Sequence, residues 1–411
     1  MINFNKFSLE NGLKVLVHED DSTPMACVNI LYDVGARDED PEKTGFAHLF
    51  EHLMFGGSVN IPNYDTPLQL VGGENNAFTT NDITNYYLTL PANNLETAFW
   101  LESDRMLSLA FSEKSLEVQR GVVIEEFKQR YLNQPYGDVW LLLRPMAYKI
   151  HPYRWPTIGK EISHIENATM QDVKDFFKKF YIPSNAILVI AGNVKTDEVK
   201  ILAEKWFGPI PSGLKFVRNL PAEPRQLAAR KETVYRDVPA NAIYKVYHMC
   251  SRKDQDFYAT DIISDILSRG NSARLYIELV KNKKLFSDVS AYVMAEFDKS
   301  LFCISGKISE GVSVEDAEKG INDELMKIVR GEISEREITK CKNKIEASLI
   351  FSETDLGTKA TNLAIYELFG DANGVNTEGE KFQAVKLEDI VRVAEEIFVE
   401  ENCTTLYYLK K

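Results

Sequence analysis

The chain has little histidine or cysteine and no long apolar run, and each scarcity excludes a class of protein. Among 411 residues there are 6 His and 5 Cys, and the cysteines are scattered, with no Cys-x-x-Cys pair. A disulfide-stapled scaffold and a thiolate metal site are therefore not expected. No apolar run reaches the length of about 18 residues that crosses a bilayer, so no membrane span is predicted.

Positive charge is also scarce. The formal net charge is -13, and no basic block offsets it, which argues against a nucleic-acid-binding protein. Residues 1–7 lack the basic segment and apolar core of a secretory signal, so we expect a cytoplasmic location, or a periplasmic one if a leader has been removed. The hydrophobic share of 44% and the length of 411 residues are typical of a soluble globular protein with at least two domains.

Two of the rare histidines lie close together in an apolar segment. Residues 45–55 predict a buried helix that carries His48, Glu51 and His52. Positions i, i+3 and i+4 share one helix face, so these three side chains point the same way. Two imidazoles with a carboxylate beside them provide two zinc ligands and a base for a water molecule. The order His-x-x-Glu-His is that of the inverzincin peptidases.

The alternative is a core helix whose histidines bond to backbone carbonyl groups. That interpretation places the ionisable Glu51 in apolar surroundings without a partner, which costs free energy. We therefore favour the metal site.

The segments around this helix read as a mixture of strands and helices. Residues 6–18 predict a hairpin that turns at Asn11 and Gly12. Further strands are expected over residues 26–34, 75–80, 84–90 and 186–192, and further helices over residues 95–109, 113–130 and 170–180.

The C-terminal half repeats this pattern. The strand expected at residues 242–248 and the helix at 257–267 mirror the strand and helix around His48, and residues 387–409 mirror 170–192. The period of about 200 residues is too long for a solenoid. We predict an α+β fold of two homologous domains, each with a mainly antiparallel sheet and helices packed on one face. The expected ranges are 1–212 for the metal domain, 213–229 for a Pro/Gly-punctuated linker and 230–411 for the second domain.

A catalytic zinc ion needs a third protein ligand. The helix at residues 113–130 is the candidate, because carboxylates follow its buried apolar stretch. By spacing alone Glu125 and Glu126 compete, and since they project about 100° apart only one can face the metal.

The motifs as a whole resemble those of the pitrilysin/insulinase family of zinc peptidases, which includes mitochondrial processing peptidases and short bacterial two-domain members. The resemblance covers essentially the whole chain and rests on residues 48–52, 72–80 and 119–126. It implies one Zn²⁺ per chain, held by His48, His52 and Glu126, with Glu51 as the general base. It also implies a supporting position for Gln119, where some members carry Glu.

The same resemblance implies that Asn76 and Ala77 lie on an edge strand to which the peptide substrate adds as a further strand. Recognition by main-chain hydrogen bonds requires an extended, unfolded peptide. The alternative for Asn76 is a simple turn residue.

The C-terminal half departs from the family pattern. Members carry an Arg and, seven residues on, a Tyr that bind substrate and stabilise the oxyanion, and the matching positions here are Val280 and Ser287. Arg269 and Tyr276 have the same spacing but lie outside the family register, so we interpret them as turn and packing residues.

These features predict a zinc-dependent endopeptidase for short or unfolded peptides. We expect it to be the catalytic subunit of a two-chain enzyme whose homologous partner supplies the Arg and Tyr, with a homodimer as the alternative. The rival function is a non-catalytic assembly subunit of a larger complex, since the family contains such proteins. A regulatory metal-binding module is a third function, with no specific feature in its favour.

Overall fold

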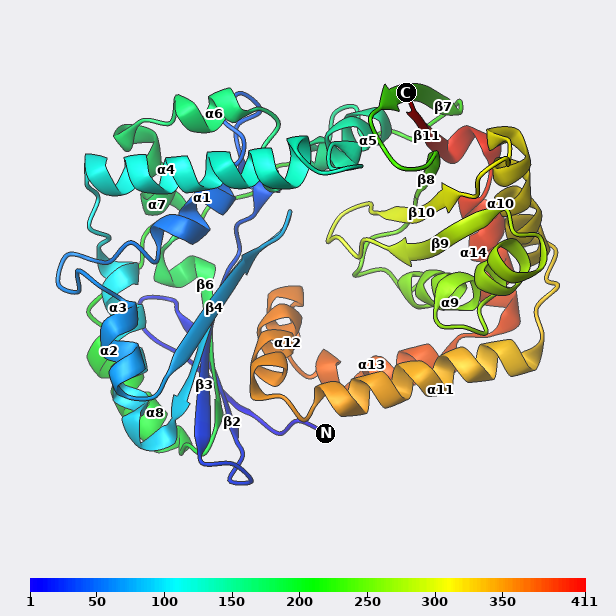
Figure 1. Ribbon diagram of the computed structural model, residues 1–411. Helices are drawn as coiled ribbons and strands as arrows, with labels where there is room; N and C mark the ends of the chain where they lie inside the picture. Colours follow the sequence, from blue (N-terminus) through cyan, green and yellow to red (C-terminus); the bar gives the residue numbers. More distant parts are fainter. The chain divides into compact units, whose positions relative to one another are not determined.

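The computed structural model describes residues 1–411, and the chain forms two compact units, which are described separately (Figure 1). The first unit comprises Met1–Lys128, Trp155–Leu220 and Ile350–Thr377, and the second comprises Gln129–Arg154, Pro221–Leu349 and Glu378–Lys411. The ranges 1–212 and 230–411 thus supply most of one unit each. Each sequence half also contributes one segment to the other half's unit.

The first unit is built on a six-stranded sheet in the order β1-β2-β6-β3-β5-β4. The strands are β1 (Asn5–Ser8), β2 (Lys14–Glu19), β3 (Met25–Tyr32), β4 (Glu74–Thr79), β5 (Thr84–Pro91) and β6 (Ala186–Gly192). Only the β2–β6 pair is parallel. The predicted hairpin is present as β1 and β2, and Gly12 adopts the positive φ of +89° that the turn needs. Strand β4 forms one edge of the sheet.

Helices cover one face of this sheet and a single helix covers the other. The first group comprises α1 (Phe46–Leu53), α2 (Asp65–Leu70), α3 (Leu95–Leu107), α4 (Glu113–Phe127), α6 (Ile162–Glu166), α7 (Met170–Phe180) and α8 (Thr196–Trp206). On this face, Tyr32 packs against Tyr181, with ring centroids 4.6 Å apart. The opposite face carries Asn29, whose side-chain oxygen accepts a hydrogen bond of 3.1 Å from Thr361 of α12 (Leu356–Phe369). Because successive strand residues point to opposite faces, α12 lies on the far side of the sheet from Tyr32 (Figure 1).

The second unit repeats this topology with a five-stranded sheet in the order β7-β11-β8-β10-β9. Its strands are β7 (Arg230–Arg236), β8 (Ala242–His248), β9 (Phe286–Val293), β10 (Leu301–Ile308) and β11 (Cys403–Lys410). The parallel pair is β7–β11, as β2–β6 is in the first sheet, and β9 is an edge strand, as β4 is. The match of strand orders supports the predicted duplication.

This sheet also has a helix layer on one face and one helix on the other. The layer contains α9 (Phe257–Ser268), α10 (Val314–Val329), α11 (Glu335–Ser352), α13 (Gly374–Ala384) and α14 (Leu387–Ile397). Ile243 and Tyr247 pack into this layer. Their neighbours Ala242 and Val246 pack with α5 (Val139–Ala147). Two π-helical turns, Lys128–Leu132 and Tyr276–Asn282, follow α4 and α9 respectively.

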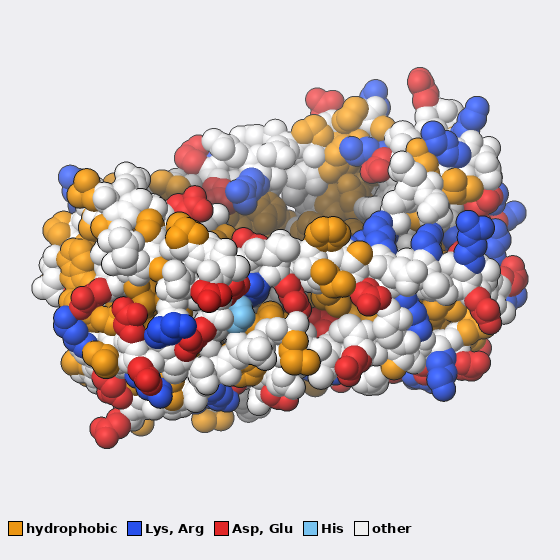
Figure 2. All heavy atoms as spheres, turned by 90° about the horizontal axis from the view of Figure 1, so that it is seen from below, with side chains coloured by type: hydrophobic (Ala, Val, Ile, Leu, Met, Phe, Trp, Pro, Cys, Tyr) orange, Lys and Arg blue, Asp and Glu red, His pale blue; other side chains and the backbone are white.

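The surface is charged but mixed. Figure 2 shows acidic and basic side chains interspersed over the face that it presents. None of the helices combines the length and the apolar character that spanning a membrane requires. The expectation of a cytoplasmic location stays a prediction.

Candidate metal centre

The start of helix α1 is shaped by a glycine and a buried carboxylate. Gly45 has φ of +88°, and a Cβ there would lie 2.7 Å from the carbonyl oxygen of Ile158, so only glycine fits. The Glu39 carboxyl accepts backbone hydrogen bonds from Gly45 at 2.9 Å and from Ala47 at 2.8 Å. These bonds satisfy two of the free N–H groups at the helix end and fix where the helix begins.

Glu39 is fully buried beneath the helix that carries the histidines. Burial raises its pKa to about 8, against the opposing hydrogen bonds from Ala47, Gly45 and Trp155. At neutral pH this carboxyl is therefore held mostly protonated. Nothing in the local sequence pattern marks Glu39, seven residues before the first residue of α1, as the cap of that helix.

The apolar side of α1 is packed into the first unit, which turns its polar side outward. Phe46, Leu49, Phe50 and Leu53 are buried, whereas His48, Glu51 and His52 are half-buried. The imidazole centroids of His48 and His52 lie 4.9 Å apart. The predicted shared face of the helix is therefore present.

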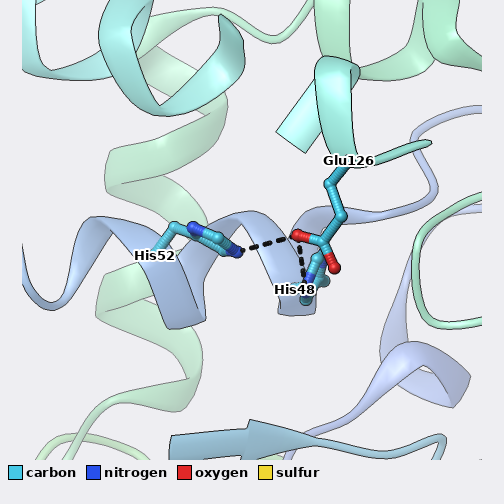
Figure 3. Close-up of side chains that lie close together, drawn as sticks. All are labelled: His48, His52 and Glu126. Atoms are coloured by element: carbon cyan, nitrogen blue, oxygen red, sulfur yellow. Dashed lines mark ion pairs between the residues drawn. The ribbon is translucent and has the colours of Figure 1, made fainter. Parts of the chain in front are cut away.

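Helix α4 brings Glu126 to these two histidines. The Glu126 Oε2 atom lies 3.8 Å from Nε2 of His48 and 3.5 Å from Nε2 of His52 (Figure 3). The neighbouring Glu125 is 62% exposed and pairs with Lys128 at 2.7 Å. Of the two competing carboxylates, the structure thus brings Glu126 to the histidines and leaves Glu125 in solvent.

Two contacts hold α4 in place. The Ser112 side chain caps its first turn by accepting from the backbone of Ser115 at 3.0 Å. Farther along, Arg120 donates to the carbonyl oxygen of Ala168 at 2.6 Å. Gln119, two turns before Glu126, is half-buried and makes no hydrogen bond to the cluster. Its supporting role stays a prediction.

The geometry and chemistry of the three side chains fit a zinc ion. One ligand atom from each residue lies within 4.8 Å of the others. Ligands at about 2.0–2.1 Å from a tetrahedral zinc are roughly 3.3–3.4 Å from one another, close to the observed separations. Two imidazoles and one carboxylate are also a donor set of catalytic zinc sites, which keep a fourth position open.

Strand β4 runs beside this cluster. Its last residue, Thr79, donates a hydrogen bond of 2.6 Å from Oγ1 to Oε2 of Glu51. Asn76 and Ala77 lie on the same strand, which pairs only with β5. The predicted edge position of these two residues is therefore present, and their role in substrate binding stays a prediction. Alternation along the strand could have identified Thr79, because it shares a face with Ala77.

The positions that depart from the family pattern lie in the second unit. Val280 packs against the core, and Ser287 is exposed on β9, where its hydroxyl donates to the carbonyl oxygen of Lys307 at 3.3 Å. Arg269 pairs with Asp265 at 3.1 Å, and Tyr276 lies under the Lys281 ammonium group. These contacts agree with the interpretation of Arg269 and Tyr276 as turn and packing residues.

The fold and the cluster together define a two-domain α+β protein with a His/His/Glu centre of the kind found in zinc peptidases. Residues 14–159 match the family described as Insulinase (Peptidase family M16), and residues 167–345 match the Peptidase M16 inactive domain. The zinc protease PqqE of Helicobacter pylori is 33% identical over 406 residues, which cover 97% of this chain and 91% of the relative. The chain belongs to the M16 peptidase family, as the resemblance had predicted.

Other relatives and solved structures agree with this assignment. The uncharacterized zinc protease YmxG of Bacillus subtilis is 23% identical over 412 residues, which cover 98% of this chain and 97% of the relative. A crystal structure of a protease from Helicobacter pylori superposes with a TM-score of 0.93 and 32% identity, covering 99% of this chain and all of that one. The periplasmic protease PqqL from Escherichia coli gives a TM-score of 0.80 at 16% identity, covering the whole of this chain but 48% of its own.

Proposed function

We propose that this chain is a zinc-dependent endopeptidase and the catalytic subunit of a two-chain enzyme. The observation that carries the proposal is the convergence of His48, His52 and Glu126, with Glu51 on the same helix face and an open strand edge beside them. The zinc proteases among its relatives support this chemistry at the level of the family.

His48, His52 and Glu126 would hold one Zn²⁺ per chain. Zinc supplies Lewis-acid chemistry, polarising a carbonyl group and acidifying water. The three ligands are 13%, 24% and 18% exposed, so a small ion and a peptide can reach them without unfolding of the unit.

Glu51 would act as the general base. Its carboxylate accepts a proton from the attacking water and passes it to the amine nitrogen that leaves when the peptide bond breaks. The apolar side of α1 fixes the helix, and so keeps Glu51 one turn from His48 and next to His52.

Substrate would bind as an added strand at Asn76 and Ala77. The backbone N–H of Ala77 points away from β5, since it bonds to the Asn76 side-chain oxygen at 2.8 Å. In the antiparallel pattern the main-chain groups of Asn75, Ala77 and Thr79 then face the open edge. An extended peptide can pair with them, so unfolded peptides are the expected substrates and folded proteins poor ones.

A partner chain would complete the site. The second unit offers Val280 and Ser287 in place of an Arg and a Tyr. Val280 has no donor, and Ser287 has a short hydroxyl, which donates to Lys307, where a long phenol is needed. The whole of this chain superposes on 48% of the longer PqqL chain, so this chain corresponds to about half of that protein. The alternative of a non-catalytic assembly subunit is disfavoured because all three ligand positions and the base are present.

The test compares metal content and peptide hydrolysis in matched variants. Glu126→Gln should lose zinc, measured by elemental analysis of the purified protein, whereas Glu125→Gln, one residue away in solvent, should keep about one zinc per chain. Glu51→Gln should keep zinc but lose about two to four orders of magnitude in turnover, because an amide cannot take the water's proton.

Two results would contradict the proposal. Zinc loss in Glu125→Gln with retention in Glu126→Gln would show that the wrong carboxylate has been chosen. Near-normal turnover by zinc-loaded Glu51→Gln would show that Glu51 is not the general base.

A further inference from the structure

We propose that Thr79 is a positioning residue for Glu51 and joins substrate binding to the orientation of the base. This inference rests on the proposed role of Glu51. The observation behind it is the 2.6 Å hydrogen bond from Thr79 Oγ1 to Glu51 Oε2, which connects the edge strand β4 to helix α1. A hydroxyl bound to a carboxylate at this distance is a charge-assisted hydrogen bond, stronger than a neutral one.

The position of Thr79 in strand β4 connects this hydrogen bond to substrate binding. Thr79 and Ala77 alternate with Phe78, so their side chains share the face toward α1. The main-chain groups of Thr79 also belong to the set that faces the open edge, as those of Ala77 do. One residue therefore offers its backbone to an incoming peptide and its hydroxyl to the base.

The Thr79 hydroxyl restrains a torsion of Glu51 that has no sharp preference of its own. The terminal torsion of a Glu side chain is broad and has no sharp staggered wells. A donor that holds Oε2 fixes the plane of the carboxylate, and with it the direction of the second oxygen. Because rate depends steeply on the alignment of a base with its proton, loss of this restraint on Glu51 should lower turnover without weakening peptide binding.

The experiment uses a hydroxyl deletion and a hydroxyl-preserving control on the full chain. Thr79→Val keeps the branched shape and the strand preference but cannot donate, whereas Thr79→Ser keeps the donor. For an unstructured peptide we expect Thr79→Val to lower kcat about 10- to 100-fold with KM within about threefold, and Thr79→Ser to stay near wild type. Zinc content should be unchanged in both variants, since neither touches a ligand.

A direct readout accompanies the kinetics. Crystal structures of the zinc-loaded proteins should show the Glu51 carboxylate in one orientation in the wild type and Thr79→Ser, and rotated or in several orientations in Thr79→Val. An unchanged Glu51 orientation in Thr79→Val would overturn the inference, with or without a loss of activity. So would equal kinetic losses in Thr79→Val and Thr79→Ser, because the hydroxyl would then not be the cause.

The double variant separates this inference from the proposed function. If Glu51→Gln abolishes turnover, adding Thr79→Val should lower it no further, and peptide affinity measured by fluorescence anisotropy should be the same in both proteins. Retained turnover in Glu51→Gln would refute the proposed role of Glu51 as the general base. A normal Thr79→Val protein beside an inactive Glu51→Gln protein would remove only the role of Thr79.

Discussion

Helices α1 and α9 occupy matching places in the two units and carry different chemistry on the same spacing. In α1 the positions i, i+3 and i+4 are His48, Glu51 and His52. In α9 the same spacing holds Asp261, Ser264 and Asp265 within a mainly apolar helix. Both helices bury their apolar faces against a sheet with the same strand order. The repeated architecture therefore does not require the metal site.

The facing helices differ in a matching way. Helix α4 presents the Glu126 carboxylate to two imidazoles. In the second unit, burial raises the pKa of Asp265, and Arg269 opposes the rise most strongly. Lys344 and Lys340 of helix α11 oppose it more weakly. One pair of helices thus has the donor set for a cation, and the other balances carboxylates with the protein's own cations. The difference teaches that a few polar positions, and not the fold, decide which unit has a donor set for a metal ion.

The largest expected effect concerns what the second unit lacks. Because Val280 has no donor and the short Ser287 hydroxyl donates to Lys307, this chain alone should be a weak enzyme. A homologous chain that brings an Arg and a Tyr should raise peptide cleavage. Each such donor is worth roughly 3–4 kcal/mol, or about 100- to 1,000-fold in rate. The measurement is peptide cleavage by this chain alone, by the candidate partner alone and by the mixture.

Variants of this chain give the control. Arg269→Ala and Tyr276→Phe should leave the activity of the mixture unchanged, because these side chains serve packing and an ion pair with Asp265. The need for a partner would be refuted if the isolated chain were fully active and if both substitutions left that activity unchanged. Assembly of this chain with itself at full activity would point to the homodimer.

A second effect, on stability, comes from the different ways in which the two helices begin. Helix α1 starts on the buried Glu39, which bonds two backbone N–H groups, whereas α9 starts at Asp256, whose carboxylate instead pairs with Arg392. Glu39→Ala should cost the first unit about 1–3 kcal/mol in free energy of unfolding, because two buried donors lose their acceptor. Urea unfolding of the metal-free protein measures this loss.

Glu39→Gln is the matched control. Its single amide oxygen can accept one of the two N–H bonds that Glu39 receives on separate oxygens, and since burial raises the pKa of Glu39 to about 8, little charge is removed at neutral pH. It should therefore cost less than Glu39→Ala. Equal losses in the two variants would show that the volume of the side chain matters and its hydrogen bonds do not.

The local elements and the metal cluster were within reach of the sequence. Periodicity identified α1 and the hairpin, and edge strand β4 followed from the family motif. Spacing could not choose between Glu125 and Glu126, because a difference of about 100° on a helix matters only once the neighbouring helix is placed. That choice came from the family register, and the structure places Glu126, not Glu125, near the histidines.

The exchange of helices between the halves lay beyond the sequence. Helix α12 comes from the C-terminal half, yet Ala360, Leu363 and Ala364 are buried in the first unit. Helix α5 makes the reverse exchange, with Val139 and Leu143 buried against the second sheet. An apolar stripe on a helix indicates that the helix packs against a sheet, but it does not indicate which sheet. A duplicated chain has two similar sheets, and either could accept the helix. The buried Glu367 of α12, bridged by Lys6 and Lys14, is the kind of contact that decides between them.

The smallest expected effect tests Asp261 and Asp265, the carboxylate pair of α9 that has the i, i+4 spacing of the two histidines in α1. Burial, together with the like charges of Asp265 and Glu378, raises the pKa of Asp261 to about 6, against the attraction from Arg269 and Arg252. A folded-state pKa above the ordinary value of 3.8 means that the folded chain binds the extra proton more tightly. This contribution to stability is complete below about pH 4 and is lost as the pH rises through about 6. Asp261→Asn should therefore stabilise the second unit at pH 7.5 by on the order of 1 kcal/mol and by less at pH 5, because the attraction to the two arginines is lost at the same time.

Asp256 at the start of the same helix provides a control of opposite sign. Its hydrogen-bonded ion pair with Arg392 lowers the pKa of Asp256, so its contribution to stability is present above the ordinary pKa and is lost as the pH falls through the lowered one. Asp256→Asn should therefore destabilise the second unit at pH 7.5, with a loss that fades in acid. Thermal unfolding of both variants from about pH 2 to about 8 compares the two slopes, since that of Asp261 falls between about pH 4 and 6 and that of Asp256 below its ordinary pKa of 3.8. Asp261→Asn would contradict this expectation if it destabilised the second unit at pH 7.5, as Asp256→Asn should. The attraction of Asp261 to Arg269 and Arg252 would then outweigh its repulsion from Asp265. The second unit would then be a charge-paired counterpart of the metal centre and not a strained one.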